Sequence, residues 1–494
     1  MKKIQINKIL LLPFLAALLT GIARLPIHLG FISYCGFIPL LFFFDRKPSF
    51  RVINQGAFVF SFVYTITALH WITLVTLPGF VGMILLFYLY FLIIFHLNNI
   101  IWIKNHNFRY LGFLLLWLAF EHLLNYGQFS FPWFYTGYSL ADYTILLQPA
   151  EIGGVTLISL YVILTNILIY QFIVIGKKSP IIWLLAIHLI WVGYSNWRYH
   201  TIKLENTHRR AGIVQISIPQ NLKWKSAYRD TTFNLYDEYI GKLSDETDMV
   251  ILPESAIPGC ILNPYDLRDY ESKNFVTRMV KKHKKAIFTG FPDCIDDDDD
   301  LIYNSCNLFD STGYAYQPYY KHILVPFGER MPLLNVMPVL NRIKLGQANW
   351  EYGKELRYYE YEGLRFTPQI CFEVAFPDIN VQMAANDPVF IVNLTNDAWF
   401  YHSAGTYQHA MMTRFRAIET RTQYFRSANT GISLIVNPRG DILARTDIFT
   451  RETIEADIYD YQGKSLFVRY FHDFPNILIG LLVLLLLWSL IKKD

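Results

Sequence analysis

Three reactive side chains, Glu254, Lys321 and Cys371, are of types that suit acyl transfer through a thiol, and two of them, Glu254 and Cys371, stand at or near the ends of predicted strands. Cys371 closes an apolar run at 366–371, and Glu254 follows a second run at 248–252. A strand end is a place from which a rigid scaffold presents a nucleophile. A carboxylate can take the thiol proton and later return a proton to a leaving group. The cation of Lys321 would stabilise both the thiolate and the oxyanion of a tetrahedral intermediate.

Each of these side chains also has an ordinary structural explanation. A buried thiol, an exposed glutamate and a surface lysine are common in proteins of any function. The occurrence of all three in segments of this kind is what favours a catalytic site.

The composition indicates a membrane protein with more than one domain. At 494 residues the chain is too long for one ordinary domain. Its apolar fraction is 53% and its charged fraction 17%, against roughly 45–50% and 25% for soluble domains. The net charge of +4 is small, and no arginine-rich patch alternates with aromatic residues, so nucleic acid is not expected as a partner.

Eight apolar stretches approach the roughly 20 residues that a membrane-spanning helix needs. They cover 9–22, 27–44, 55–77, 80–103, 110–125, 155–175, 180–195 and 474–491. A cleaved signal peptide is the alternative for 1–22, but no small-residue cleavage site follows it. We predict a bundle of eight transmembrane helices, divided into a seven-helix domain at 1–196 and a C-terminal helix at 471–494, with a catalytic domain at 197–470 between them.

The distribution of positive charge predicts how the chain is oriented. Lysine and arginine gather before the first predicted span and after the second, fourth, sixth and eighth, as at Lys2, Lys3, Lys8, Arg46, Lys47, Arg51, Lys104, Arg109, Lys177, Lys178, Lys492 and Lys493. Cytoplasmic loops carry such an excess of positive charge. Both termini are therefore predicted to be cytoplasmic, with residues 197–470 on the other side of the membrane.

Beyond Arg198 the pattern is that of an α/β domain. Short apolar runs at 211–218, 248–252, 286–290, 304–309, 366–371, 389–394 and 432–436 predict strands, and amphipathic stretches at 231–243, 274–284 and 407–420 predict helices. Two hairpins are predicted, at 307–316 and 433–445, because Asp-Ser-Thr-Gly and Asn-Pro-Arg-Gly turns lie within them.

The connection between the fifth and sixth predicted spans contains an aromatic run at 129–135. Tryptophan and tyrosine concentrate in the headgroup region of a bilayer. The run is therefore interpreted either as an anchor at the membrane interface or as part of a route for substrate.

The five cysteines do not predict a metal site, because they form no CxxC pair and have no metal-ligand spacing. A disulfide between Cys294 and Cys306 remains open from the sequence. The aspartate run at 296–300 is best explained as a solvated loop tip, since it lacks the alternation of a calcium-binding loop. No metal or cofactor is expected.

The order of the motifs resembles the Glu-Lys-Cys triad of the nitrilase, or carbon–nitrogen hydrolase, superfamily, and especially its membrane branch, the apolipoprotein N-acyltransferases. The segments that carry the resemblance are 253–254, 320–329 and 370–373, with Val-Gln-Ile-Ser-Ile-Pro-Gln at 214–220, Lys-Trp at 223–224, Thr-Asn-Asp-Ala-Trp-Phe at 395–400, Arg-Ala-Ile-Glu at 416–419 and Ala-Asn-Thr-Gly at 428–431. The likeness covers nearly the whole chain. It implies a nitrilase-like α-β-β-α sandwich between the seventh and eighth helices.

The resemblance also implies a role for individual residues. Glu254 matches the general base, Lys321 the oxyanion-stabilising lysine and Cys371 the nucleophile. The supporting residues would be Glu329, Glu373 and Asn304, and the substrate-binding residues Trp224, Phe372 and Trp399. Phe372 departs from the tyrosine usual in the family, which removes a hydroxyl from that position.

By this resemblance, Cys371 would take an acyl chain from a phospholipid and pass it to the α-amino group of a diacylglyceryl-modified N-terminal cysteine of an apolipoprotein. The expected protein is a monomeric, multi-pass enzyme of the inner membrane with its catalytic domain in the periplasm. The nearest alternative is a membrane-tethered amidase or nitrilase that uses the same triad with water. A transporter is less well supported, because Glu121 and a few histidines are the main ionisable groups in the predicted spans.

Overall fold

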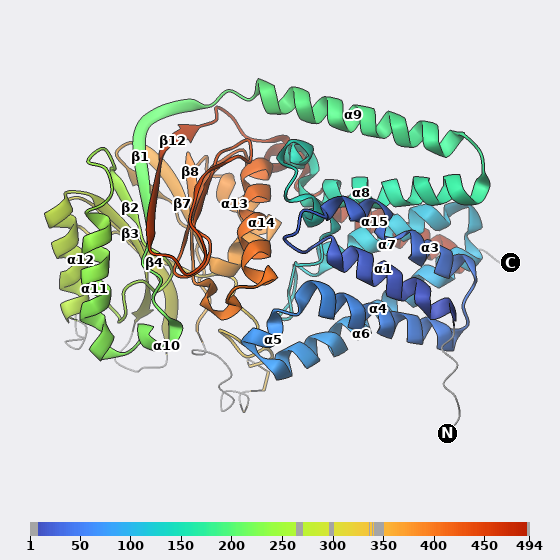
Figure 1. Ribbon diagram of the computed structural model, residues 1–494, viewed down its shortest axis with the longest axis horizontal. Helices are drawn as coiled ribbons and strands as arrows, with labels where there is room; N and C mark the ends of the chain where they lie inside the picture. The colour runs from blue at the N-terminus through green and yellow to red at the C-terminus, as the bar shows by residue number, and fades with distance from the viewer. Residues whose placement is uncertain are drawn as a thin grey trace.

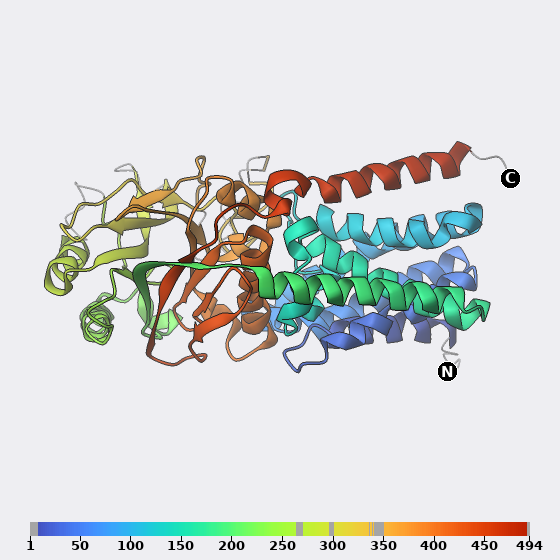
Figure 2. The same cartoon turned by 90° about the horizontal axis from the view of Figure 1, so that it is seen from above.

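The computed structural model describes residues 8–262, 270–295, 301–334, 336–337, 339 and 350–491. A bundle of helices and a pair of stacked β-sheets lie end to end along the long axis (Figure 1). The long helix α9 (Ser179–Thr201) leaves the bundle and leads into the first strand, and α15 (Phe474–Ile491) returns from the sheets along the bundle (Figure 2). The chain therefore crosses between the two parts twice.

The bundle is built from apolar helices that present large hydrophobic side chains outward. Besides α9 and α15 it contains α1 (Leu11–Ile22), α2 (Ser33–Gly36), α3 (Ile38–Asp45), α4 (Phe50–Leu69), α5 (Ile72–Val75), α6 (Leu77–Lys104), α7 (Arg109–Leu123) and α8 (Ala150–Ile175). Leu189 is 76% exposed and Ile190 is 70% exposed on α9. An apolar outer face of this extent suits a lipid environment, in which helices satisfy their own backbone hydrogen bonds.

Four helices in the described part of the chain are long and apolar enough to cross a membrane, namely α4, α6, α8 and α9. Shorter apolar helices lie at Lys8–Ile22, Gly30–Asp45 and Phe474–Ser489, where the first, second and eighth spans are predicted. The 15-residue α7 lies at the fifth. The apolar helical region is thus confirmed, while the count of eight crossings remains a prediction.

α9 runs past residue 196, where the sequence predicts the first domain to end. Arg198 donates two hydrogen bonds to the buried Glu151 of α8, at 2.5 and 2.9 Å, and the Tyr194 hydroxyl donates a third at 2.6 Å. These bonds hold the polar last turns of α9 against α8, although the apolar stretch has already ended.

The sheets have six strands each. Their orders are β12-β1-β2-β3-β4-β5 and β11-β10-β9-β8-β7-β6. The first contains β1 (Glu205–Gln215), β2 (Met249–Ile251), β3 (Ala286–Cys294), β4 (Ile302–Phe309), β5 (Tyr319–Tyr320) and β12 (Glu452–Asp460). The second contains β6 (Tyr359–Tyr361), β7 (Leu364–Ile370), β8 (Phe390–Thr395), β9 (Gln423–Ala428), β10 (Leu434–Val436) and β11 (Ile442–Arg445). The central strands β1–β3 and β7–β9 run parallel within their sheets.

Helices cover the outer faces of both sheets, which gives the four-layer arrangement predicted from the sequence. α11 (Ser226–Ile240) and α12 (Tyr270–His283) lie at the end remote from the bundle, whereas α13 (Pro377–Ala384) and α14 (Ala404–Thr420) lie between the sheets and the bundle (Figure 1). The short α10 (Gln220–Lys223) follows β1. Aromatic rings fill the space between the sheets: Phe288 of β3 packs edge-on against Phe366 of β7 at 5.2 Å.

All seven predicted strands are present with shifted ends, but β9 and β12 and the short strands β5 and β6 were not predicted. β9 is fully buried, although its sequence contains Gln423 and Arg426, and the edge strand β12 is rich in acidic residues. Both depend on partners far away in the sequence: Arg426 bonds Asn393 of β8 at 2.7 Å, and β12 pairs with β1. Hydrophobic pattern alone gives no signal for such strands.

α14 is joined to the bundle at a break in α8. Gly154 has φ +64°, which interrupts the helix and leaves the amide of Val155 without a helical acceptor. The Glu419 carboxylate accepts that amide at 2.7 Å and also the guanidinium of Arg416 at 2.8 Å. The Arg-Ala-Ile-Glu motif therefore connects the two parts of the protein.

The aromatic run at 129–135 lies mostly buried between the bundle and the sheets rather than on the membrane surface. Trp133 is 2% exposed and donates a hydrogen bond to Gln408 of α14 at 3.1 Å. Phe134 stacks on Tyr64 of α4, with ring centroids 4.5 Å apart. The interpretation as an interfacial anchor is thus wrong for Trp133 and Phe134.

The structure has a disulfide between Cys260 and Cys294, and Cys306 is free and buried. A Cys294–Cys306 bond is therefore excluded. In the antiparallel pair β3–β4, Cys294 lies opposite Ile302 and Cys306 opposite Gly290. This register separates the two cysteines along the strands. The aspartate run at 296–300 lies outside the described residues.

The disulfide is expected to stabilise the catalytic domain, because it links residues 34 positions apart. By loop-closure entropy such a link contributes about 4 kcal/mol. Cys260→Ala should lower the thermal midpoint of the purified protein by several degrees, and a reducing agent should lower the midpoint of the unaltered protein but not of the variant. Cys35→Ala, which removes an exposed free cysteine, is the control. Equal midpoints for Cys260→Ala and Cys35→Ala would contradict this expectation.

Candidate active site

The three residues predicted to do chemistry all lie beyond the ends of strands. Lys321 follows β5 directly, Cys371 follows β7 directly, and Glu254 lies three residues past the last residue of β2. β2 and β5 belong to one sheet and β7 to the other. The charges of Glu254 and Lys321 both influence the pKa of the Cys371 thiol, so the three side chains share one site.

Glu254 and Lys321 belong to a buried cluster of charges. The Lys321 Nζ is 2.8 Å from Glu329 Oε1 and 3.6 Å from Glu254 Oε1, and the lysine side chain is fully buried. Asn304 of β4 donates to the same carboxylates, at 2.7 Å to Glu254 and 3.0 Å to Glu329. The second oxygen of Glu329 accepts the amide of Val325 at 2.8 Å. Every charged member therefore has a partner, as a buried ionic cluster requires.

The ammonium of Lys321 is fixed in its charged form. Burial acts to lower the pKa of Lys321, but the charges of Glu329 and Glu254 outweigh it, and the pKa is raised above its usual value. A permanently charged donor in a buried site can stabilise an oxyanion without reorganisation.

Asn304 orients the carboxylate of Glu254. Because its Nδ2 group donates to two carboxylates, its Oδ1 must point away from them, and this oxygen is buried with no hydrogen-bond partner in the described part of the chain. An unpaired buried acceptor is costly unless a ligand supplies a donor.

The turn that carries Glu254 packs closely against β3 at a glycine. A Cβ atom at Gly290 would lie 2.8 Å from the backbone nitrogen of Ser255 and 2.9 Å from the Cα of Glu254. Any larger residue would push the carboxylate away from Lys321. Gly290 is therefore part of what positions the acid–base group.

Cys371 lies on a strained turn between β7 and the 3-10 helix η8 (Cys371–Ala375). Its φ is +51°, a left-handed conformation that is unfavourable for a residue with a Cβ. Its carbonyl oxygen is held by Nδ2 of Asn393 at 3.3 Å and lies 3.3 Å from Nε2 of His409. The turn ends the strand at Cys371, and the charges of Glu254 and Lys321 both act on its thiol.

The Cys371 thiol is protonated in the resting enzyme. Burial raises its pKa above the usual value, the negative charge of Glu254 raises it further, and the positive charge of Lys321 acts in the opposite direction. A protonated thiol is a weak nucleophile, so attack requires a base that accepts the proton. Glu254 has the chemistry and the position for this step.

Glu373 supports the site from within the turn. Its carboxylate accepts the amide of Ile370 at 2.7 Å, the amide of His322 at 2.7 Å and the Tyr319 hydroxyl at 2.9 Å. Burial raises its pKa to about 7, although the two amide hydrogen bonds oppose the shift. One carboxyl group thus ties the nucleophile turn to the segment that carries Lys321.

A second buried cluster lies behind the nucleophile and was not predicted. His409 Nδ1 is 2.9 Å from Asp397 Oδ1 and 3.0 Å from the Arg426 guanidinium, which also bonds Asp397 at 2.8 Å. Burial and the charge of Arg426 lower the pKa of His409, whereas the charge of Asp397 and the hydrogen bonds to Asp397 and to the Cys371 carbonyl oppose the shift. Nδ1 of the ring faces a carboxylate oxygen and Nε2 faces the Cys371 carbonyl oxygen, so both nitrogens lie beside hydrogen-bond acceptors.

The same cluster has the residue types of a metal site. The Cys371 sulfur, a carboxylate oxygen of Asp397 and a ring nitrogen of His409 lie within 4.8 Å of one another. However, the guanidinium of Arg426 already places a positive charge on Asp397 and His409. The donor set therefore does not fit a metal ion.

A second lysine, Lys223 of α10, also reaches the site and was noted in the sequence only as part of a motif. Its Nζ donates to the backbone carbonyl of Glu254 at 2.8 Å. Burial lowers its pKa to about 8, although the charges of Glu254 and Cys371 oppose the shift. This bond fixes the turn that presents the Glu254 carboxylate.

The three predicted substrate-binding residues differ in their surroundings. Trp224 and Trp399 are exposed by 43% and 39%. Their segments are connected, since Asn396 donates to Gln220 of α10 at 2.7 Å. Phe372 is buried and stacks on Trp133, with ring centroids 5.9 Å apart. The phenyl ring of Phe372 thus packs on an aromatic residue of the bundle side, a contact that needs no hydroxyl.

The sequence matches known families over both of its parts. The carbon-nitrogen hydrolase family matches residues 210–462, and the apolipoprotein N-acyltransferase N-terminal domain matches residues 16–168. An apolipoprotein N-acyltransferase of Haemophilus influenzae is 31% identical over 393 residues, which cover 76% of this chain and 73% of the relative. The chain belongs to the apolipoprotein N-acyltransferase family. As a member of that family it is an acyltransferase with a nitrilase-like domain.

The chain is also similar to another curated relative and to two solved structures. An apolipoprotein N-acyltransferase of Geobacter metallireducens is 28% identical over 460 residues, covering 89% of this chain and 87% of the relative. An amidase from Nesterenkonia sp. is similar over 56% of this chain and 98% of its own, with 15% identity and a TM-score of 0.43. Nit3 of Saccharomyces cerevisiae covers 51% of this chain and 89% of its own, with 18% identity and a TM-score of 0.39.

The residues that the sequence did not single out as functional are those that hold the reacting groups in place. His409, Arg426 and Asn393 lie within a predicted helix, an unpredicted strand and a predicted strand. Each reads as an ordinary polar residue in its segment. A possible signal was available only for Asp397, which lies in the Thr-Asn-Asp-Ala-Trp-Phe motif.

The raised pKa of Cys371 predicts how its alkylation depends on pH. Because only the thiolate reacts, and its fraction rises with pH while the pKa stays above the pH, the rate of iodoacetamide labelling of the resting enzyme should increase about tenfold per unit between about pH 7 and 9. The measurement is mass spectrometry of the peptide that contains residue 371. Cys371→Ala gives the background from other thiols. A rate independent of pH would show that the thiolate is already formed.

The position of His409 predicts that it supports the turn rather than acting as the base. His409→Ala should lower the rate of acyl transfer about 10- to 100-fold, because removing a hydrogen bond to a buried group costs about 1–3 kcal/mol. The pH dependence of Cys371 alkylation should stay unchanged. His402→Ala, which alters an exposed histidine, is the control. A displaced pH profile in His409→Ala would instead assign the thiol proton to this ring.

Proposed function

We propose that the protein transfers an acyl chain from a membrane phospholipid, through a thioester on Cys371, to the α-amino group of the diacylglyceryl-modified N-terminal cysteine of apolipoproteins. The observation that carries the proposal is the convergence of Glu254, Lys321 and Cys371 from both sheets, in a domain attached to a bundle of apolar helices. Relatives named apolipoprotein N-acyltransferase support the choice of substrates.

In the first step, Glu254 accepts the Cys371 proton as the sulfur attacks the ester carbonyl of the phospholipid. The carbonyl oxygen becomes an oxyanion that the Lys321 ammonium stabilises. Glu254 then donates its proton to the departing alkoxide, which leaves as the hydroxyl of a lysophospholipid. The products are a thioester on the enzyme and one lysophospholipid.

In the second step, the α-amino group of the acceptor attacks the thioester. Glu254 takes a proton from the amine, the carbon–sulfur bond breaks as the amide forms, and Glu254 returns the proton to the Cys371 sulfur. The unpaired Oδ1 of Asn304 is suited to accept a hydrogen bond from the incoming N–H group, since it is buried with no partner among the described residues. An amide forms, and the enzyme returns to its starting state.

Both substrates are lipids, and the surroundings of the site suit them. Phe400, beside Trp399, packs edge-on against Trp71 of the bundle at 4.7 Å. Gly405 allows this approach, because a Cβ there would lie 2.5 Å from the Trp71 ring. We infer that Trp399, exposed beside this contact, and Trp224, exposed on a segment that is hydrogen-bonded to the loop of Trp399, receive acyl chains that leave the bilayer.

A cavity of about 350 Å³ adjoins the residues that flank the catalytic groups. Its lining includes His322, next to Lys321, and Phe376, close to Cys371 in the chain, together with Gln128 and Ser130 from the bundle. The mixture of polar and apolar side chains suits a lipid headgroup or the first residues of a lipoprotein. We assign the route of one substrate to this cavity.

The family and the apolar helices indicate a multi-pass protein of the inner membrane. We propose that both termini are cytoplasmic and that the catalytic domain, 197–470, is periplasmic, on the basis of the alternating lysine and arginine content of the connections. We further propose that the enzyme acts as a monomer with helical domains at 1–196 and 471–494.

A membrane-tethered amidase would use the same triad with water. The stability of the acyl-enzyme distinguishes the two reactions, since a transferase must keep water from its thioester until the amine arrives.

The test is to incubate the purified protein with a phospholipid and to follow Cys371 by mass spectrometry. We expect an acyl adduct on Cys371 and a lysophospholipid, both stable until a lipopeptide with a free diacylglyceryl-cysteine amine is added. The lipopeptide should then gain one acyl chain. Cys371→Ala should abolish both steps, whereas Cys306→Ala, which alters another free cysteine, should not. Release of free fatty acid without an acceptor would favour the amidase, and full activity in Cys371→Ala would overturn the mechanism.

A further inference from the structure

A second cavity lies at the junction of the bundle and the sheets, on a different face of α14 from the nucleophile. Its volume is about 350 Å³, and its lining comes from the loop after α1, the segment around 138–142, α14 and β11. Gln408, Met411, Met412 and Phe415 of α14 face it. His409, which contacts Cys371, is not part of the lining.

The cavity carries an excess of positive charge. Arg24, Arg414 and Arg445 belong to its lining, and Asp142 is the one carboxylate among the lining residues. Asp142 is already paired with His28, another lining residue, at 3.1 Å. The charges of Asp142 and of Asp441 also act on Arg414, so an anion inside the cavity would meet three guanidinium groups and one carboxylate of the lining.

Several polar atoms of this lining lack partners within the described ranges. Nε of Arg414 and Oγ of Ser139 are buried without a hydrogen bond. Arg414 does donate from Nη1 to the carbonyl of Ala141, and Arg24 donates to the carbonyl of Tyr135 at 3.0 Å. Both guanidinium groups are thus held in place by backbone oxygens while retaining further donors. Fixed donors of this kind favour a ligand with several acceptor oxygens.

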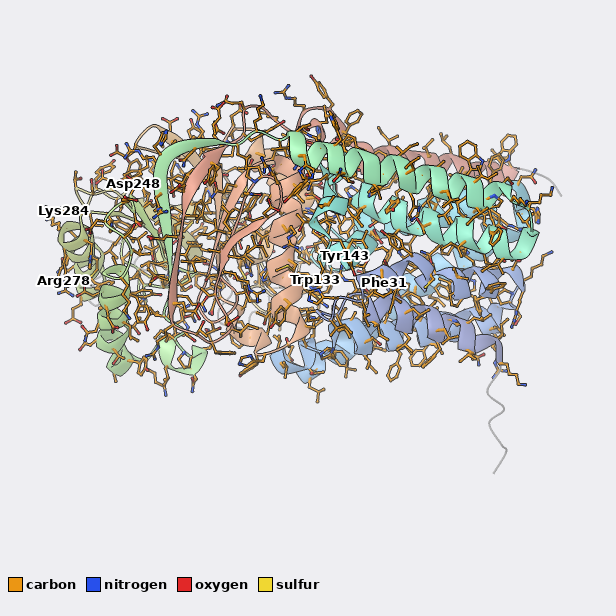
Figure 3. All side chains as sticks on the ribbon, turned by 45° about the horizontal axis from the view of Figure 1, so that its top comes forward. Phe31, Trp133, Tyr143, Asp248, Arg278 and Lys284 are labelled. Carbon is orange, nitrogen blue, oxygen red and sulfur yellow. A yellow bond between two sulfur atoms is a disulfide. The ribbon has the colours of Figure 1, made fainter. Side chains whose placement is uncertain are left out.

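Part of the lining is apolar, and exposed apolar side chains follow it along the chain. Leu25, Met411, Met412, Phe415 and Ile442 line the cavity. Next to it along the chain, Ile27 and Phe31 are 50% and 52% exposed. Phe31 and Tyr143 lie at the junction in Figure 3, where the outer surface changes from the bundle to the sheets. The site is therefore open to a molecule with a charged head and an apolar tail.

We propose that this cavity binds one anionic phospholipid of the membrane leaflet on the catalytic side. The phosphate would lie among Arg24, Arg414 and Arg445, and an acyl chain would extend along Ile27 and Phe31 into the bilayer. Inorganic phosphate shares the charge chemistry but would leave the apolar lining unfilled. This cavity shares no lining residue with the cavity beside the catalytic groups, and the proposal does not depend on the reaction proposed above.

The test uses the full-length protein in phosphatidylcholine nanodiscs that contain a small fraction of photoactivatable phosphatidylglycerol. Crosslinks mapped by mass spectrometry are expected in the peptides that cover 23–31 and 407–415. Each arginine removed should weaken retention of the anionic lipid about fivefold, which corresponds to about 1 kcal/mol for one charge near a membrane surface. The variants are Arg445→Gln alone and combined with Arg414→Gln.

Arg278→Gln is the matched control, because Arg278 is exposed on α12 at the end of the molecule remote from the bundle (Figure 3). Arg445 is exposed and makes no side-chain hydrogen bond or ion pair among the described residues, so its single variant should keep the thermal midpoint of the unaltered protein. Crosslinks elsewhere, an equal loss in Arg278→Gln, or equal crosslinking of photoactivatable phosphatidylcholine would overturn the proposal. Thermal stabilisation by inorganic phosphate equal to that by phosphatidylglycerol would assign the site to a free anion instead.

Discussion

The site depends on an ammonium group buried between two carboxylates. Lys321 has no contact with solvent, and it remains charged because Glu329 and Glu254 lie beside it. An unpaired charge at this depth would be strongly destabilising. The ion cluster therefore fixes the three segments that contribute to it, and the same arrangement aims one carboxylate and one ammonium at the thiol. Stability of the fold and readiness for catalysis arise here from one set of contacts.

The helix α14 holds the turn that carries the nucleophile Cys371 in place, as the ion cluster holds the segments of Glu254 and Lys321. One of its residues, His409, lies against the Cys371 carbonyl, and its neighbour Gln408 accepts hydrogen bonds from Trp71 and Trp133 of the bundle at 3.1 Å each. Farther along the helix, Glu419 bonds the break in α8. A displacement of the bundle relative to the sheets would therefore be transmitted to the strained turn at Cys371. The helices of the bundle are part of the support of the active site as well as a connection to the membrane.

The sequence predicted those elements whose signal lies in a short, continuous stretch of residues. The long apolar stretches, the strands before Glu254 and Cys371 and the helix at 407–420 could be predicted because their patterns are local. The Cys260–Cys294 bond could not, because the choice among cysteines depends on the register of β3 against β4. The burial of Trp133 could not either, because a tryptophan near a membrane suits a headgroup region as well as an interface between domains. The count of membrane crossings stays a prediction, since α7 and the shorter helices are below the length that decides the matter.

By itself the sequence predicted the chemistry of the site, because a glutamate and a cysteine at predicted strand ends, with a lysine between them in the chain, allow few reactions and because the surrounding motifs belong to one family. Only the tertiary structure decided how these groups are held. The contacts of Asn304, His409, Arg426 and Lys223 join residues that are far apart in the chain, and no local pattern encodes them. The physical reason is that the chemistry of a reactive residue follows from its own side chain. A supporting residue acts only through the polar atom that the fold places next to it, and that neighbour is not visible in the sequence.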